Sequence, residues 1–158
     1  MTFDTKAFRQ ALGAFPTGVA VIIASEGAHN TGITVNSFTS VSLDPPLVLW
    51  CLAKDSQRYD VFVGAPRFTI SILGTEHEEV SSRLARQGEH RLGGFPLTGT
   101  SLGVPVLSEA LATFECEHHG AQDGGDHTIL LGKVLRFSRR EGAPLIFHGG
   151  RYGALSGI

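Results

Sequence analysis

Residues 32–51 read GITVNSFTSVSLDPPLVLWC, and this stretch is the best guide to the fold. Hydrophobic and polar side chains alternate at its start, which is typical of a β-strand with one buried face. Asp44-Pro45-Pro46 then predicts a turn, because proline has no backbone N–H to donate to a sheet. The run Leu47–Ala53 is nearly continuously apolar and predicts a second strand.

The first strand of this stretch is expected to span residues 31–41 and to carry a polar face. Side chains two residues apart share a face of a strand, so one face is expected to present Thr34, Asn36, Phe38, Ser40 and Ser42. Their hydroxyl and amide groups suit the carbonyls and ring nitrogens of a flat heterocycle, or the oxygens of a phosphate. Judged by its residue types alone, this polar face is explained more simply as a solvent-exposed strand face, on which serine and threonine are tolerated.

The composition is that of an ordinary globular protein. Of the 158 residues, 42% are hydrophobic and 18% are charged, which predicts one domain spanning 1–158 with a core large enough to fold. A net charge of −2 gives no reason to expect nucleic acid or an acidic membrane surface as a partner. We recognise no signal peptide and no membrane-spanning run, so a cytoplasmic location is expected. Cys51 and Cys116 lie in apolar runs and are expected to be reduced core thiols.

The other predicted elements are short and separated by turns, as 20 glycines and 7 prolines suggest. Strands are expected at 19–23, 67–73, 110–118, 128–137 and 144–147, with a turn at 120–125 and a long loop at 87–105. Three short helices are expected: one capped by Asp4 or Thr5, one capped by Ser56, and one opened by a capping box of Thr75 and Glu78. Strands joined by turns predict a mainly β protein with a few short helices, an antiparallel, Greek-key-like barrel rather than a doubly wound sheet.

A possible anion site follows the second strand of the opening stretch. Residues 54–58, KDSQR, join that strand to the start of a helix, whose free N–H groups attract negative charge. An ordinary helix cap surrounded by solvated charges explains the same residues. The chain has no glycine-rich phosphate loop and no Gly-x-Gly-x-x-Gly motif, so a nucleoside triphosphatase or a Rossmann fold lacks support.

Histidine and acidic residues gather between 115 and 127, and they raise a second class of function. If the turn at 120–125 folds two strands together, His118 or His119 approaches Asp126 and His127. Imidazole and carboxylate groups are suitable metal ligands. The spacing lacks a tight motif such as His-Glu-x-x-His, so we predict no metal and keep a metal-dependent hydrolase as the less favoured alternative.

Residues 34–47, TVNSFTSVSLDPPL, resemble the signature of the short-chain flavin reductase family, whose members supply reduced flavin to two-component monooxygenases. Other segments resemble the family in the same order along the chain. Residues 8–19 resemble its entry helix and first strand, 68–73 a later strand, 125–134 its Gly-Asp-His strand, and 144–152 its end. The resemblance covers nearly the whole chain, and two of these motifs are too specific to be explained by chance.

The resemblance implies a fold, an activity and an assembly. The implied fold is an FMN-binding split β-barrel, built as a homodimer with each flavin near the subunit interface. The implied enzyme is an NAD(P)H:flavin oxidoreductase that reduces FMN or FAD with NADH or NADPH and passes reduced flavin to a partner monooxygenase. A flavin-binding module without turnover is the alternative from another class.

The resemblance also assigns residues to the site. It implies that the flavin ring edge is lined by Thr34, Val35, Asn36 and Ser37. It implies phosphate-side roles for Ser40, Ser56 and Arg58, with Ala53 and Lys54 passing beside the flavin. His127 of the Gly-Asp-His motif is the catalytic candidate, as a group that positions the incoming nicotinamide, and Tyr152 is expected to help hold that ring.

Overall fold

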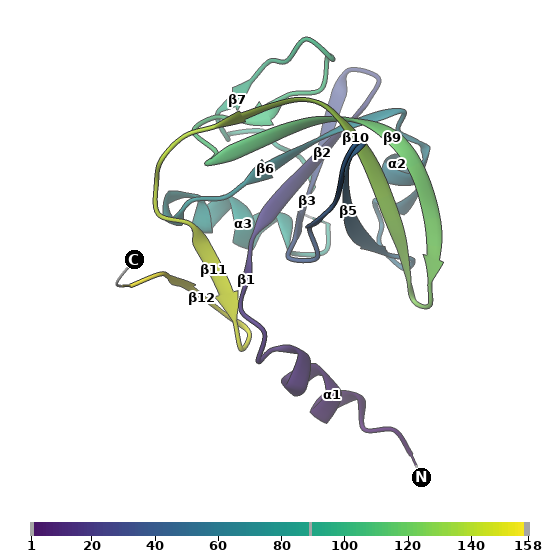
Figure 1. Ribbon diagram of the computed structural model, residues 1–158, viewed down its shortest axis with the longest axis vertical. Coiled ribbons are helices and arrows are strands. Elements are labelled where there is room, and N and C mark those ends of the chain that lie inside the picture. Colours follow the sequence, from purple (N-terminus) through teal and green to yellow (C-terminus); the bar gives the residue numbers. More distant parts are fainter. Residues whose placement is uncertain (1, 89, 157–158) are drawn as a thin grey trace.

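The chain folds around one strongly curved antiparallel sheet with a few short helices (Figure 1). A computed structural model describes residues 2–88 and 90–156. The helical elements are α1 (Thr5–Leu12), α2 (Tyr59–Gly64), the 3-10 turn η1 (Thr75–His77) and α3 (Glu78–Leu84). The strands are β1 (Thr17–Gly18), β2 (Ala20–Glu26), β3 (His29–Val35), β4 (Thr39–Leu43), β5 (Pro46–Ala53), β6 (Arg67–Ile72), β7 (Leu97–Thr98), β8 (Val106–Leu107), β9 (Ala112–Gly124), β10 (His127–Arg139), β11 (Leu145–His148) and β12 (Arg151–Ala154).

The main sheet is rolled, because its two edge strands are neighbours in the sequence. Seven strands run in the order β3-β2-β6-β9-β10-β5-β4. A flat sheet of this width would separate its edges by about 29 Å, at roughly 4.8 Å per strand. Only residues 36–38 join β3 to β4, and a link of that length reaches at most about 14 Å. The sheet therefore curls into a split β-barrel, as the sequence predicted.

The expected single strand over residues 31–41 is wrong, and this short link is the reason. β3 ends at Val35, and the side chains of Thr34 and Ser40 belong to opposite edges of the sheet. Within the link, the Ser37 hydroxyl accepts a hydrogen bond from the Cys51 N–H at 2.9 Å, which fastens the link to β5. The link crosses the split of the barrel, so a continuous strand with one polar face does not form.

β2 is buried on both faces, which explains its almost continuously apolar sequence. Ile22 points into the barrel, toward a cluster that contains Trp50 and Phe68. Val21 and Ile23 point to the opposite side, into a second cluster. The other buried members of that second cluster are Val19, Leu73, Val80, Leu84, Leu92, Val104, Leu107 and Leu145. This second cluster packs α3 and the long loop after it against the outer face of β2 and β3.

Gly132 lies where β10 passes closest to the barrel core. A Cβ atom added there would lie 2.6 Å from Phe68 Cζ and 3.0 Å from Cys116 Cβ. Both neighbours are fully buried. We expect Gly132→Ala to lower the free energy of unfolding by about 2 kcal/mol through overpacking, measured by urea denaturation. Gly120→Ala is the matched control because its Cβ would meet nothing within 4 Å; equal losses in the two variants would contradict this explanation.

The two cysteines are free and differ in access. Cys116 is fully buried, and burial raises the pKa of its thiol to about 12. Cys51 is only half-buried on β5, which corrects the expectation of two core thiols. Because the thiolate is the reactive form, we expect a thiol reagent at neutral pH to modify Cys51 and to spare Cys116 until the protein unfolds. Two thiols reacting in the folded protein would contradict this prediction.

α1 projects from one end of the molecule and buries none of its residues (Figure 1). Asp4 caps it as predicted, with its carboxylate accepting hydrogen bonds from the N–H groups of Lys6 and Ala7, both at 3.0 Å. The side chains of Phe8 and Leu12 remain exposed. α1 therefore presents an apolar face that the described part of the chain does not cover.

α2 and α3 form, but their starts differ from the prediction. The Ser56 hydroxyl accepts from the Arg58 N–H at 3.2 Å, and α2 begins at Tyr59. The predicted Thr75–Glu78 capping box is wrong, because the Gly74 N–H donates to His77 Nδ1 at 3.2 Å. No helix in the described ranges is long and apolar enough to cross a bilayer.

The hairpin of β9 and β10 is longer than predicted. β9 continues to Gly124, which pairs with His127, so the expected turn at 120–125 is wrong. The chain reverses at Gly125, whose φ of 77° lies in the left-handed region that glycine adopts without strain. His118 is paired with Gly132, several residues along the strand from the turn.

A further hairpin, which the sequence did not indicate, forms from β11 and β12. β11 and β12 pair from Leu145 to Ala154, and β1 pairs with the other side of β11. Tyr152 lies opposite Phe147, and their ring centroids are 5.6 Å apart in an edge-to-face arrangement. This hairpin brings both aromatic rings to the outer side of β2 and β3.

Candidate functional site

Three cavities lie in a row beside the end of β3. The first, the polar cavity, shares Thr34 and Ala85 with the second, the middle cavity. The middle cavity shares Val19 and Asn36 with the third, the inner cavity. Their volumes are about 180, 160 and 180 Å³, each below the roughly 300 Å³ at which typical ligand pockets begin. Only as a row do they make a site for an elongated molecule.

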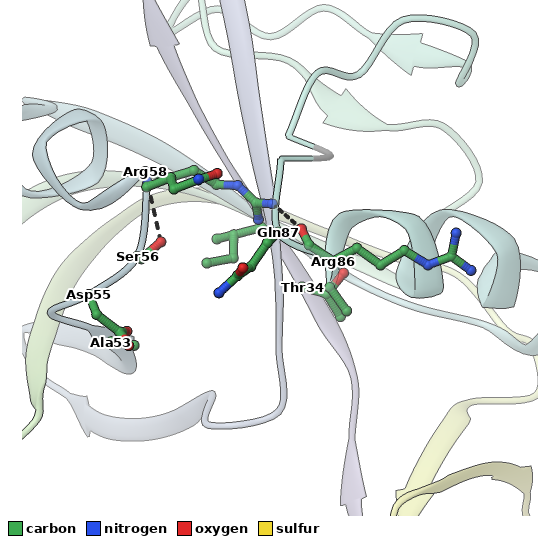
Figure 2. A pocket seen from close by; sticks show the side chains of 10 residues that line it. Thr34, Ala53, Asp55, Ser56, Arg58, Arg86 and Gln87 are labelled. Atoms are coloured by element: carbon green, nitrogen blue, oxygen red, sulfur yellow. Dashed lines mark hydrogen bonds between the residues drawn. The ribbon is translucent and has the colours of Figure 1, made fainter.

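The polar cavity forms where β3, the loop after β5 and the residues after α3 meet (Figure 2). Residues 55–58 line it from one side, and Arg86 and Gln87 line it from the other. Ile33, Thr34, Ala53 and Ala85 complete the lining. Hydroxyl, amide and guanidinium groups together suit an anion such as a phosphate.

Arg58 holds the wall of the polar cavity together, as Figure 2 shows. Only 5% of its surface is exposed. Its Nη1 donates to the Leu84 carbonyl at 2.9 Å, and its Nη2 donates to the Arg86 carbonyl at 2.6 Å. The last carbonyls of a helix have no partner within the helix, so Arg58 provides partners at the end of α3. Burial lowers the pKa of the guanidinium from its ordinary value, yet it stays charged at neutral pH.

The middle cavity is mostly apolar. Its lining consists of Val19, Thr34, Val35, Asn36, Ala85, Phe147 and Tyr152. The Thr34 hydroxyl donates to the Ser81 carbonyl at 2.8 Å, so this polar group is already bonded to the protein. The Tyr152 hydroxyl lies 2.7 Å from the Ser81 hydroxyl. Such a lining suits the faces of an aromatic ring system.

The inner cavity continues this apolar surface toward the barrel. Gly18, Val19, Ala20, Asn36, Phe38 and Ile72 line it. Asn36 is exposed and belongs to the link between β3 and β4. Its amide group is therefore placed between the middle and inner cavities, where it can donate to or accept from a ring substituent.

His127 lies beside the row, at the start of β10. It is paired with Ala53, which lines the polar cavity. Its Nδ1 lies 2.7 Å from Asp126 Oδ1, and because a carboxylate only accepts, Nδ1 carries the proton and Nε2 is left for a ligand. The same hydrogen bond lowers the pKa of the Asp126 carboxyl.

Three predicted residues lie at the margin of the row. Lys54 forms an ion pair with Asp123, and this contact raises the pKa of Lys54 and lowers that of Asp123. Ser40 is exposed on β4, outside the three cavities. The Ser37 hydroxyl bonds the backbone of Cys51. These three side chains therefore line none of the three cavities.

The fold brings most of the predicted site residues together. Those that line the polar or middle cavity are Thr34, Val35, Asn36, Ala53, Ser56, Arg58 and Tyr152. The prediction missed residues 85–87 and Phe147. No local pattern marks residues 85–87, because only the packing of α3 against β3 brings them to the cavity.

The histidine and acidic residues at 115–127 are spread along the hairpin of β9 and β10. His118 is opposite Gly132, whereas His127 is opposite Gly124. Among the residues that the structure describes, no three His, Cys, Asp or Glu side chains gather as metal ligands. The arrangement that a metal-dependent hydrolase would need here is not formed.

Comparison with known protein families decides the assignment. The family described as "Flavin reductase like domain" matches residues 12–156. The chain belongs to the flavin reductase family. The family predicted from residues 34–47 and the segments that follow is thereby confirmed.

Relatives of this flavin reductase family member match it over most of its length. FMN reductase (NADH) SmoA from Agrobacterium fabrum is 46% identical over 153 residues, which cover 97% of this chain and 87% of SmoA. HsaB, the reductase subunit of a flavin-dependent monooxygenase from Rhodococcus jostii, is 34% identical, with 94% of this chain and 77% of HsaB covered. Two relatives from Rhizobium meliloti are longer, and the chain spans 44% and 59% of them.

A solved structure of the family has the same fold. It is the NADH:FAD oxidoreductase SgcE6 of Streptomyces globisporus in complex with NAD and FAD fragments. The TM-score is 0.89 at 36% sequence identity, and the match covers 99% of this chain and 97% of that chain.

Proposed function

We propose that this chain is a cytoplasmic NAD(P)H:flavin oxidoreductase that reduces FMN or FAD and supplies reduced flavin to a flavin-dependent monooxygenase. The row of three cavities along β3, in a chain of the flavin reductase family, carries the proposal. The names of its relatives support the proposed cofactors and partner. SmoA is named for FMN and NADH, SgcE6 for FAD and NADH, and HsaB as the reductase subunit of a monooxygenase. The proposal treats residues 1–158 as a single flavin reductase-like domain.

The residues of the row fit a flavin nucleotide. The middle and inner cavities offer apolar surface for the ring system, and the backbone of residues 34–37 runs along its edge. The polar cavity offers Ser56 and Arg86 to a phosphate, with Arg58 behind them. In our proposal Ala53 lies beside the flavin, and Lys54 and Ser40 contact its outer, polar parts from outside the three cavities.

The chemistry itself belongs to the cofactors. A bound flavin accepts a hydride directly from a nicotinamide, without a protein nucleophile. The chain therefore contributes by holding the two rings in contact, which is an effect of orientation. In our proposal His127, fixed through Nδ1 by Asp126, uses Nε2 to position the nicotinamide carboxamide. Tyr152 provides a side wall for the nicotinamide ring.

A second copy of the chain is part of the proposal. Phe8 on α1, Leu43 on β4 and Phe137 on β10 are exposed, the last two by 94% and 77%. In the proposed homodimer, contact with the second copy buries side chains of this kind, as the apolar cores of dimer interfaces do. In a homodimer the second copy supplies walls for cavities that are individually too small to enclose a flavin. Gel filtration should give twice the mass of the chain, and a monomer would exclude this part.

Steady-state kinetics test the proposed activity. We expect oxidation of NADH or NADPH by oxygen to depend on added riboflavin, FMN or FAD, with one nicotinamide and one flavin clearly preferred. Flavin binding without any turnover would favour the non-catalytic flavin-binding module instead. Neither binding nor turnover would overturn the proposal.

A further inference from the structure

Ser81 of α3 contacts residues of the site without lining any of the three cavities. It is fully buried, with 0% of its surface exposed. Its hydroxyl lies 2.7 Å from the Tyr152 hydroxyl. Its carbonyl accepts hydrogen bonds from the Thr34 hydroxyl at 2.8 Å and from the Ala85 N–H at 3.1 Å. Thr34, Ala85 and Tyr152 all line the middle cavity, so Ser81 joins three of its walls.

The two polar groups of Ser81 act on different walls. The carbonyl holds β3 and the end of α3, which border the polar cavity as well. Within residues 2–88 and 90–156, the hydroxyl contacts Tyr152 on the hairpin of β11 and β12. That hairpin is short, and the Tyr152 ring otherwise rests edge-on against Phe147. The hydrogen bond to Ser81 therefore links the Tyr152 ring to the main body of the protein.

We propose that Ser81 is a positioning residue that holds the Tyr152 ring in place as the side wall for the nicotinamide. This inference rests on the proposed function. Without the Ser81 hydroxyl, the Tyr152 ring keeps its contact with Phe147 but gains freedom to swing about it. The nicotinamide must then order this ring when it binds, which weakens binding of the nicotinamide more than binding of the flavin, because the flavin has further walls in the inner and polar cavities.

Alanine at position 81 separates the two groups of Ser81. Ser81→Ala removes the hydroxyl and keeps the backbone carbonyl, so the contacts with Thr34 and Ala85 remain. Tyr152→Phe removes the same hydrogen bond from the other side. We expect each variant to raise the KM for NADH about fivefold, the factor that corresponds to the net strength of one ordinary hydrogen bond. The double variant should equal either single variant, because both remove one shared interaction.

Ser71→Ala is the matched control. Ser71 is equally buried, and its hydroxyl accepts from the Leu107 N–H at 3.1 Å, outside the three cavities. The variant loses one buried hydrogen bond, and we expect its KM for NADH to stay within about twofold of the unchanged protein. A general loss of stability would change the KM for NADH alike in Ser81→Ala and Ser71→Ala. Thermal unfolding of each variant measures how much stability it loses.

Binding measurements give a readout that does not depend on turnover. Titration of FMN, followed by flavin fluorescence, should give a dissociation constant for Ser81→Ala within about twofold of that of the unchanged protein. Calorimetric titration of NAD⁺ into the FMN-loaded proteins should show about fivefold weaker binding in Ser81→Ala and in Tyr152→Phe. An unchanged NAD⁺ affinity in both variants, or equal weakening of FMN, would overturn the role of Ser81. An unchanged protein that binds no flavin and oxidises no NADH would instead overturn the proposed function, and this inference with it.

Discussion

Replacement of His127 by alanine is expected to raise the KM for NADH at least about tenfold, the equivalent of roughly 1.4 kcal/mol, while the KM for flavin changes little. The reason is that His127 is fixed by Asp126 through Nδ1 and is paired with Ala53, which lines the polar cavity. Alanine removes a group that positions the nicotinamide, without touching the residues that line the polar cavity. Initial rates measured with varied NADH at saturating flavin give the KM for NADH. Rates measured with varied flavin at saturating NADH give the KM for flavin.

His119→Ala is the control for this prediction. His119 is exposed on β9 and remote from the pairing of His127 with Ala53. We expect its kinetics to match those of the unchanged protein. A His127→Ala variant that lost flavin binding but kept its NADH kinetics would show that His127 serves the flavin instead.

Replacement of Arg58 by methionine is expected to lower the free energy of unfolding by about 3 kcal/mol and to weaken flavin binding strongly. The loss arises because two carbonyls, of the buried Leu84 and of the exposed Arg86, lose charged donors. The segment 84–87 then loses its fixed position, and the polar and middle cavities lose a common wall. Urea denaturation gives the first quantity, and fluorescence titration with FMN gives the second.

Two further variants separate this wall from a direct contact with phosphate. Arg58→Lys keeps the charge but offers no planar fork for two carbonyls, so we expect it to be destabilised almost as much as Arg58→Met. Arg86→Met removes an exposed side chain whose carbonyl remains, so its stability should change by less than about 0.5 kcal/mol. We expect Arg86→Met to bind riboflavin normally and FMN more weakly. A fully stable Arg58→Met that binds riboflavin but not FMN would assign the phosphate contact to Arg58.

The strands that the sequence predicted well are those whose burial shows in their composition. β2 and β5 lie in the core on one or both faces, and their apolar runs mark them. The strand expected over 31–41 failed because residues on both sides of 36–38 do form strands, and no glycine or proline marks 36–38 as the place where the chain passes from one edge of the sheet to the other. Alternation reports which residues are buried, and it carries no information on which strand is the neighbour.

The candidate site was predictable where a single motif builds it. Residues 34–36, which the family resemblance assigned to the flavin edge, line the cavities. Ser81 and residues 85–87 were not predictable, because tertiary contacts bring them to the site, among them those of α3 with Thr34 on β3 and with Arg58 before α2. Arg58 illustrates the same limit: its charge suggested an anion, yet two of its hydrogen bonds go to backbone carbonyls that are 26 and 28 residues away in the chain.

Anaerobic mixing with NADH tests the central claim most directly. The protein is first incubated with FMN or FAD without oxygen, and the visible absorption of oxidised flavin is followed after NADH is added. Since hydride transfer is the chemistry of the cofactors themselves, we predict rapid and complete loss of this absorption, with a trace of protein sufficient to reduce excess flavin. Flavin that stays bound and oxidised in the presence of NADH or NADPH would contradict the assignment as a flavin reductase.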